Sequence, residues 1–258
     1  MAANNGWTRN QLLIAFNLYC QMPFGKMYYR NPAIIKYAGI IGRTPSALAM
    51  KLVNIASLDP AITSTGRSGL KGASASDRAM REEMQADWDR FANEMQQAVN
   101  SFEIPELSMD VEDTIESHQT IDYTGSNKTI QTTTRVGQNF FRRSVLSAYD
   151  YRCCITGLTI PKLFVASHIV PWRIDKTNRL NPSNGLCLSV LHDKAFDIGI
   201  LTISDDMTIT VSKKCADNDD PFFISALLSY DGKSIFLPKK FSPFAEFLSY
   251  HREHIFEK

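Results

Sequence analysis

The spacing of apolar residues predicts that the N-terminal part of the chain is helical. Behind Thr8, a good helix N-cap, apolar residues recur at helical spacing. They are Leu12, Leu13, Ala15, Phe16 and Tyr19. Asn31-Pro32 opens a second predicted helix, which carries Ile34, Ile35, Tyr37 and Ala38. Thr44-Pro45 supplies the N-cap and the first residue of a third helix, and Gly42 stands in the turn before it.

The second and third of these helices form a pattern typical of a helix-turn-helix. Ala38 and Gly42 are small enough to let two helices cross closely. In the third helix Leu48, Leu52 and Ile55 share one face. We expect four polar residues at its start and opposite face to contact DNA: Arg43, Ser46, Lys51 and Asn54. A plain structural helix pair explains the pattern equally well when it is taken alone.

A Gly/Ser-rich loop at 64–74 and a long polar stretch separate the remaining elements. Arg67 and Lys71 of this loop either hold a phosphate or belong to a flexible segment. From Ser76-Asp77 an amphipathic helix is predicted, with one core stripe of Met80, Met84, Trp88, Phe91 and Met95. From 102 to 128 the periodicity is lost, which indicates a linker.

The C-terminal half alternates short apolar runs with polar loops. We expect a strand at 129–136 and a helix at 138–148 that exposes Arg142 and Arg143. The succeeding pattern predicts a strand, a long polar loop, a short strand, a helix and another strand. These lie at 163–169, 173–184, 186–188, 190–196 and 200–203, and a final helix is expected at about 244–256, where His251 and His254 are expected on the surface.

Charge is distributed unevenly along the 258 residues. Residues 1–75 carry a net charge of +7 with Asp59 as their single acid, residues 76–125 carry −10, and residues 126–258 carry +4. Two cationic units joined by an acidic connector suit a polyanionic partner such as DNA. The sequence lacks a signal-peptide pattern and a membrane-spanning run, so we expect a soluble cytoplasmic protein. Five cysteines without CxxC spacing indicate buried thiols and no structural zinc.

Polar residues capable of chemistry converge in the predicted strand–loop–strand–helix unit. His168 ends an apolar strand, where a neutral imidazole could take a proton from water. The amide of Asn184 could bridge the loop to that strand and orient His168. Asp193 and Asp197 lie four residues apart on one helical face with His192 adjacent, so one to three of them could hold a hard or borderline divalent cation.

These residues stand in runs that resemble the HNH endonuclease family, whose core is a ββα-metal fold. The runs are Ser167-His168-Ile169-Val170-Pro171-Trp172, Asn184-Gly185-Leu186 and His192-Asp193-Lys194-Ala195-Phe196-Asp197. The resemblance extends over about 135–212. Residues 135–157 are similar to the subset that occurs as standalone restriction endonucleases. The resemblance to the HNH family implies that one divalent metal, usually Mg²⁺, activates the scissile phosphate while His168 deprotonates water.

The resemblance assigns His168 as general base and Asn184 as the middle Asn. The third position departs from the family, because Asp193 stands where a His or Asn is usual and His192 lies one residue earlier. The residue before the base, often an acidic or histidine ligand, is Ser167 here. We therefore expect His168, Asn184 and His192 in catalysis, and Asp193, His192 and Asp197 as ligands of Mg²⁺, Mn²⁺ or another divalent cation.

The sequence thus predicts an α+β protein with a helix-turn-helix-like DNA-binding domain at 1–100, an acidic linker at 101–128 and an HNH ββα-metal nuclease domain at 129–258. The predicted substrate is double-stranded DNA, cut in a restriction or defence role. The N-terminal reader would recognise a sequence or a modified base, and a homodimer would supply two cuts. The alternatives are a non-catalytic DNA-binding regulator with a degenerate nuclease fold and a non-specific toxin nuclease.

Overall fold

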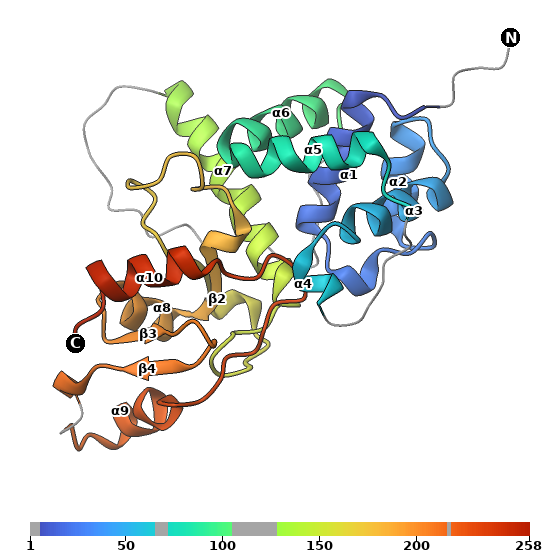
Figure 1. Ribbon diagram of the computed structural model, residues 1–258. Helices are drawn as coiled ribbons and strands as arrows, with labels where there is room; N and C mark the ends of the chain where they lie inside the picture. Colours follow the sequence, from blue (N-terminus) through green and yellow to red (C-terminus); the bar gives the residue numbers. More distant parts are fainter. Residues whose placement is uncertain (1–5, 65–71, 105–127, 216–217) are drawn as a thin grey trace, which may run out of the picture.

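A computed structural model describes residues 6–64, 72–104, 128–215 and 218–258; for 128–136 it describes the backbone only. The N-terminal part is helical, as predicted, with a short 3₁₀ turn at Phe24–Lys26. Its helices are α1 (Arg9–Gln21), α2 (Pro32–Ile40), α3 (Pro45–Ala56), α4 (Pro60–Thr63), α5 (Ala75–Ala86) and α6 (Trp88–Ser101). The long helix α7 (Lys128–Ala148) runs between this group and the strands (Figure 1).

The C-terminal part mixes two small antiparallel sheets with short helices. The first sheet pairs β1 (Phe164–His168) with β2 (Gly185–Ser189), and the second pairs β3 (Leu201–Ile203) with β4 (Ile209–Val211). The helices here are α8 (Val190–Asp197), α9 (Pro221–Ala226) and α10 (Ala245–His254). Short 3₁₀ turns lie at Pro161–Leu163, Pro182–Asn184 (η3), Lys213–Cys215 and Leu228–Tyr230. The predicted α+β class is therefore confirmed.

The predicted helix starts in the N-terminal part are confirmed by their caps. The Thr8 hydroxyl accepts from Gln11 N, and the Gln11 side chain accepts from Thr8 N in return. Asn31 caps α2, and Thr44 caps α3 through a bond from Ala47 N. Each cap satisfies a backbone donor that the first helical turn leaves without a partner.

Two predicted elements differ from the structure. The expected strand at 129–136 belongs to α7. Its β-branched residues favour strands only weakly, by less than about 1 kcal/mol per residue, so the packed helical turns that follow decide the conformation. The expected single helix from Ser76 is two helices, because the chain breaks at Asp87, whose carboxylate caps α6 through Arg90 N. The expected linker at 102–128 falls largely outside the described residues.

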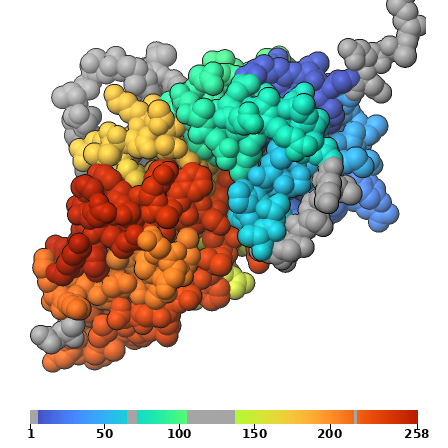
Figure 2. Space-filling view, viewed as in Figure 1, coloured from blue at the N-terminus to red at the C-terminus, as the bar shows by residue number. Residues whose placement is uncertain are grey.

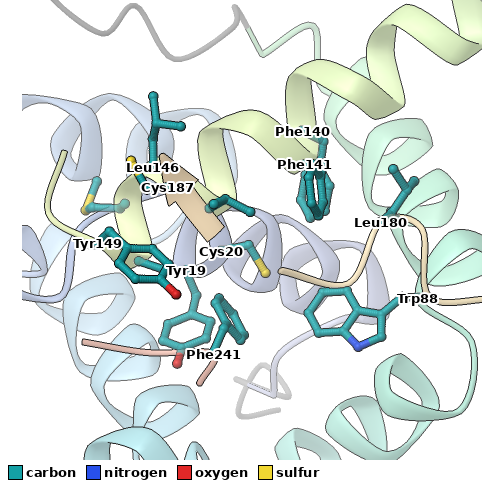
Figure 3. Close-up of a cluster of buried hydrophobic side chains, with 14 of the residues drawn as sticks. Tyr19, Cys20, Trp88, Phe140, Phe141, Leu146, Tyr149, Leu180, Cys187 and Phe241 are labelled. Carbon is teal, nitrogen blue, oxygen red and sulfur yellow. The ribbon is translucent and has the colours of Figure 1, made fainter. Parts of the chain in front are cut away.

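The core is continuous from the N-terminal helices to the C-terminal strands. All five residues of the predicted Met and aromatic stripe are buried in it, as expected. Helix α1 is buried on every side from Leu12 to Gln21 and packs against α3, α6 and α7. Figure 2 shows the N-terminal helices lying directly against the C-terminal residues, and Figure 3 shows aromatic rings from both parts side by side.

Polar contacts also cross between the two parts. The Ser147 hydroxyl of α7 donates to the Cys20 carbonyl over 2.8 Å. The Lys240 ammonium is fully buried and donates to the carbonyls of Tyr19, Cys20 and Met22, at the end of α1. Burial lowers the pKa of Lys240 to about 7.

Among the described residues, no helix is long and apolar enough to cross a membrane.

Candidate active site

The β1–β2 hairpin brings the two most informative residues of the sequence together. In the antiparallel register His168 lies opposite Gly185, which directly follows Asn184. A Cβ atom at Gly185 would meet Val145 Cγ2 at 2.4 Å and Phe141 Cζ at 2.9 Å, both on α7. The glycine is therefore required because the hairpin packs directly onto α7. Helix α8 contacts both strands.

The His168 imidazole is held in one orientation and one tautomer. Its Nε2 lies 2.9 Å from the Arg179 carbonyl, and since a carbonyl only accepts, Nε2 carries the proton. The ring stacks on Phe141 with centroids 3.8 Å apart and meets the edge of Trp172. Burial lowers the pKa of His168 to about 4, although the Arg179 carbonyl opposes this. At neutral pH Nδ1 thus carries a lone pair, and among the described residues no hydrogen bond engages it.

Asn184 bridges the strand that carries His168 to the start of the next strand. Its Oδ1 accepts from Val170 N over 2.8 Å, and its Nδ2 donates to Val170 O over 3.1 Å. The Asn184 carbonyl also accepts from Ile169 N. The side chain is fully buried. The predicted bridge is present in the structure; the catalytic role inferred from it stays a prediction.

The loop that supplies the Arg179 carbonyl is tied to a distant helix. The Arg179 guanidinium makes a bidentate pair with Asp89 of α6, with N–O distances of 2.7 and 2.9 Å. Asp89 N also bonds to the Thr177 carbonyl. The sequence analysis missed Asp89, Arg179 and the stacking partner Phe141 as residues that position His168. No local pattern marks them, since Asp89 and Arg179 are 90 residues apart.

The His192 imidazole makes both of its polar contacts within the protein. Its Nδ1 lies 2.8 Å from the Ser189 hydroxyl, and its Nε2 lies 2.9 Å from the Ala226 carbonyl. The ring is 3% exposed, and burial lowers its pKa. Both nitrogens are therefore used inside the protein, where they fasten α8 to the end of α9. Both lone-pair and N–H positions of the ring thus have partners within the protein, and the ligand and catalytic roles expected of His192 stay predictions.

Asp193 and Asp197 share one face of α8 with the hydroxyl of Ser167 nearby. Burial raises the pKa of Asp193, and proximity of the Ser167 hydroxyl partly offsets this. Burial and the neighbouring Asp193 charge raise the pKa of Asp197 to about 6. The Ser167 Oγ is buried without a hydrogen-bond partner of suitable geometry among the described residues. Ser167 directly precedes His168 in β1, so the same strand carries the candidate base, stacked on α7, and the hydroxyl beside α8.

This cluster fits a hard divalent cation. The Asp193 charge raises the pKa of Asp197, and a cation between the two carboxylates would relieve this repulsion, with the Ser167 hydroxyl as a further oxygen donor. Mg²⁺ commonly takes one or two carboxylates and completes its shell with water and substrate phosphate oxygens. Within the described part of the chain, no group of three or more His, Cys, Asp or Glu side chains is placed to hold a metal ion. Ser167, Asp193 and Asp197 would therefore hold the cation together with exogenous oxygens.

The residues of the third helix that were expected to contact DNA differ in their exposure and in their partners. Arg43 donates to the Gln11 side chain and lies over the Trp7 ring, whereas Ser46 is exposed. Lys51 was expected to project into solvent, but it is 7% exposed and pairs with the buried Asp77 at 2.8 and 3.0 Å. Its expected outward orientation is wrong, because a helix 26 residues further on covers that face.

The other expected DNA contacts are also drawn toward the protein or lie outside its described part. The Asn54 Oδ1 is buried. Arg142 Nη1 donates to the Phe164 carbonyl over 2.8 Å, and Arg143 is half-buried, so α7 does not simply expose this pair. Arg67 and Lys71 lie outside the described residues. No observation tests whether any of these residues contacts DNA.

Of the two histidines expected on the surface of the final helix, one is exposed and one is buried. His254 is exposed, as predicted, but His251 is fully buried, with hydrogen-bond contacts to the Thr202 hydroxyl and the Phe196 carbonyl. The surface prediction for His251 is therefore wrong. Of the cysteines, Cys153, Cys154 and Cys187 are buried free thiols, as expected.

Comparison with known families agrees with this geometry. A family model described as HNH endonuclease matches residues 153–204, about a fifth of the chain. The matched segment contains β1, β2, α8 and β3, and with them His168, Asn184, Asp193 and Asp197, whereas the positioning residues Phe141 and Asp89 lie outside it. A search of curated proteins found no match. The chain therefore carries an HNH endonuclease domain, a domain that hydrolyses phosphodiester bonds.

Proposed function

We propose that this protein is a metal-dependent DNA endonuclease. One observation carries the proposal: His168 is held neutral in a fixed tautomer, and the residue before it, Ser167, lies beside Asp193 of α8, whose charge Asp197 senses. A general base next to a divalent-cation site is the combination that phosphodiester hydrolysis requires.

His168 would take the proton in the hydrolytic step. A water molecule attacks phosphorus, its proton passes to Nδ1 of His168, and the bond to the leaving oxygen breaks. The Arg179 carbonyl stabilises the imidazolium that forms, because it accepts from Nε2–H. Asn184 keeps β1 and the following loop in place, so that the imidazole does not have to be oriented during the reaction. A divalent cation held by Asp193, Asp197 and Ser167 would neutralise charge on the scissile phosphate.

The N-terminal helices are proposed to contribute DNA binding. Their single acid within residues 1–75, Asp59, is 2% exposed and bonded internally, so the exposed cations Lys26, Arg30 and Lys36 face solvent without an acid from the same segment. Of the residues proposed for the third helix, Ser46 is exposed, whereas Lys51 is withdrawn into its ion pair. A nuclease combined with such a reader suits a cytoplasmic restriction or defence role. A homodimer would place two sites for a double-strand break.

Cleavage assays on wild type and His168→Ala test the proposal. Plasmid, unmodified or cytosine-methylated, is incubated with Mg²⁺, Mn²⁺ or EDTA. We expect metal-dependent cutting that falls by about 10²–10⁴-fold in His168→Ala, the usual contribution of a general base. DNA affinity, measured by fluorescence anisotropy, should be nearly unchanged. His254→Ala, which removes an exposed histidine, is the matched control and should cut like wild type.

The outcomes separate the alternative functions. Discrete fragments indicate a site-directed enzyme, and fragments formed only on methylated DNA indicate a modified-base reader. A smear without discrete fragments favours the non-specific nuclease. Binding without cleavage under every metal condition favours the non-catalytic regulator, and His168→Ala with wild-type cleavage contradicts the assigned base.

A further inference from the structure

We infer that a cavity between the N-terminal helices and the nuclease domain binds a phosphate-like oxyanion through Arg81. The cavity has a volume of about 180 Å³. A water molecule occupies about 30 Å³ of liquid, so there is room for a tetrahedral oxyanion. Its walls come from both parts of the chain, including Arg81 and Gln85 of α5, Trp88 of α6, Ser183 of η3, and Phe241.

The Arg81 guanidinium is the group that requires a partner. The residue is only 9% exposed, and its Nη1 is fully enclosed without a hydrogen-bond partner. Among the described residues it makes no hydrogen bond or ion pair at all. A buried cation without an acceptor is strongly unfavourable, whereas surface arginines are satisfied by water. The small exposed remainder of this side chain lies in the wall of the cavity.

The one acid in the cavity wall does not serve as that partner. Asp59 uses Oδ1 to accept from Ala61 N and Oδ2 to accept from the Tyr19 hydroxyl and Phe241 N. It makes no ion pair with Arg81 in the described structure. The fully buried Lys240 is also close enough to Asp59 to sense its charge. Lys240 itself lies outside the cavity wall, so Arg81 is the cation of this wall that keeps a positive charge for a ligand to neutralise.

The remaining walls combine aromatic rings with a few polar side chains. Trp88 and Phe241, labelled side by side in Figure 3, meet edge to face with centroids 5.7 Å apart, and both line the cavity. Ser183 adds a hydroxyl-bearing residue to the wall. A planar guanidinium presents donors in a fork that matches phosphate or carboxylate oxygens. The shared chemistry of such ligands has two sources: a free phosphate group, or a phosphodiester of bound DNA.

Because of its position, the cavity would couple a bound oxyanion to the candidate active site of the nuclease. Asn181 and Ser183 line it, and η3 ends at Asn184, whose side chain holds the loop after β1. The cavity is nevertheless separate from the proposed metal site, since it contains none of the residues Ser167, Asp193 or Asp197. Binding is therefore testable without cleavage and does not depend on the proposed nuclease activity.

The test is a phosphate titration of the full chain in EDTA without DNA, at an ionic strength held constant with chloride. Binding is followed by calorimetry and by thermal unfolding. At a phosphate concentration ten times Kd, the ratio of unfolded to folded protein should fall about elevenfold. Arg81→Met should lose this response. Arg78→Met, which removes an exposed arginine of the same helix, should keep it. Gln85→Glu, an exposed change at the cavity wall, should weaken phosphate binding by charge repulsion even if Arg81→Met does not fold.

Two results would overturn the inference: no response of the wild-type protein to phosphate, or equal responses in wild type, Arg81→Met and Gln85→Glu. DNA binding then distinguishes the two sources. If the ligand is a DNA phosphodiester, Gln85→Glu lowers DNA affinity, and Arg81→Met also reduces the log–log salt slope by about one. If the ligand is free phosphate, both variants bind DNA as wild type does.

Discussion

Replacing Asn184 with alanine tests whether the amide holds the candidate base in place. The change removes the acceptor of Val170 N and the donor to Val170 O, at 2.8 and 3.1 Å. Val170 is 5% exposed, so water does not readily replace the lost partners. An unsatisfied buried polar group costs about 1–3 kcal/mol. Two such groups should lower the free energy of unfolding by about 2–6 kcal/mol.

Thermal unfolding measures this loss directly. For a chain of this size 1 kcal/mol corresponds to about 2–4 °C, so Asn184→Ala should unfold at least about 4 °C below wild type. Cleavage should also fall at temperatures where the variant is folded, because the loop between His168 and Arg179 loses its anchor. Asn139→Ala, at an exposed position on α7, is the control and should change neither quantity. Unfolding within 1 °C of wild type, or full cleavage by the folded variant, would refute the positioning role.

Two further predictions concern buried ionisable groups. Burial lowers the pKa of His168 and of His251 to about 4 from 6.5, so the unfolded chain binds more protons between these values. Their contribution to stability is complete above about pH 6.5 and is lost as the pH falls toward 4. In denaturant titrations the free energy of unfolding of His251→Gln should therefore depend less on pH than that of wild type. An unchanged pH dependence of the variant would contradict this. Lys51→Met should lower stability by about 3–5 kcal/mol, since it leaves the Asp77 carboxylate buried without its cation. Its DNA affinity in anisotropy should equal that of wild type, and a stable variant with reduced affinity would restore Lys51 as a DNA contact.

Local signals in the sequence were sufficient for much of the fold. Helix starts at Thr8, Asn31 and Thr44 depend on hydrogen bonds that span two or three residues, so the residue types alone predict them. The same holds for the hairpin and α8, whose lengths and alternating pattern are visible in the chain. The strand expected at 129–136 was wrong because a weak local preference yields to the helix that continues from it.

Long-range contacts decided which polar residues are available for chemistry. The motif predicts that His168, Asn184, Asp193 and Asp197 belong to one site, and the structure pairs His168 with Gly185, next to Asn184, and brings Asp193 close to Asp197. His192 stands beside Asp193 in the motif, and only the packing of α9 shows that both its nitrogens are used.

What the sequence by itself determined is thus the order of elements, the hairpin and the residue types of the site, all of which depend on neighbours a few positions away. The tertiary structure alone decided that Lys51 pairs with Asp77, that Asp89 anchors the Arg179 loop, and that Arg81 lines a cavity. The physical reason is that burial and charge pairing depend on which distant segments meet. These contacts form where α5 and α6 cover α3 and the nuclease domain. The spacing of apolar residues within one segment does not predict them.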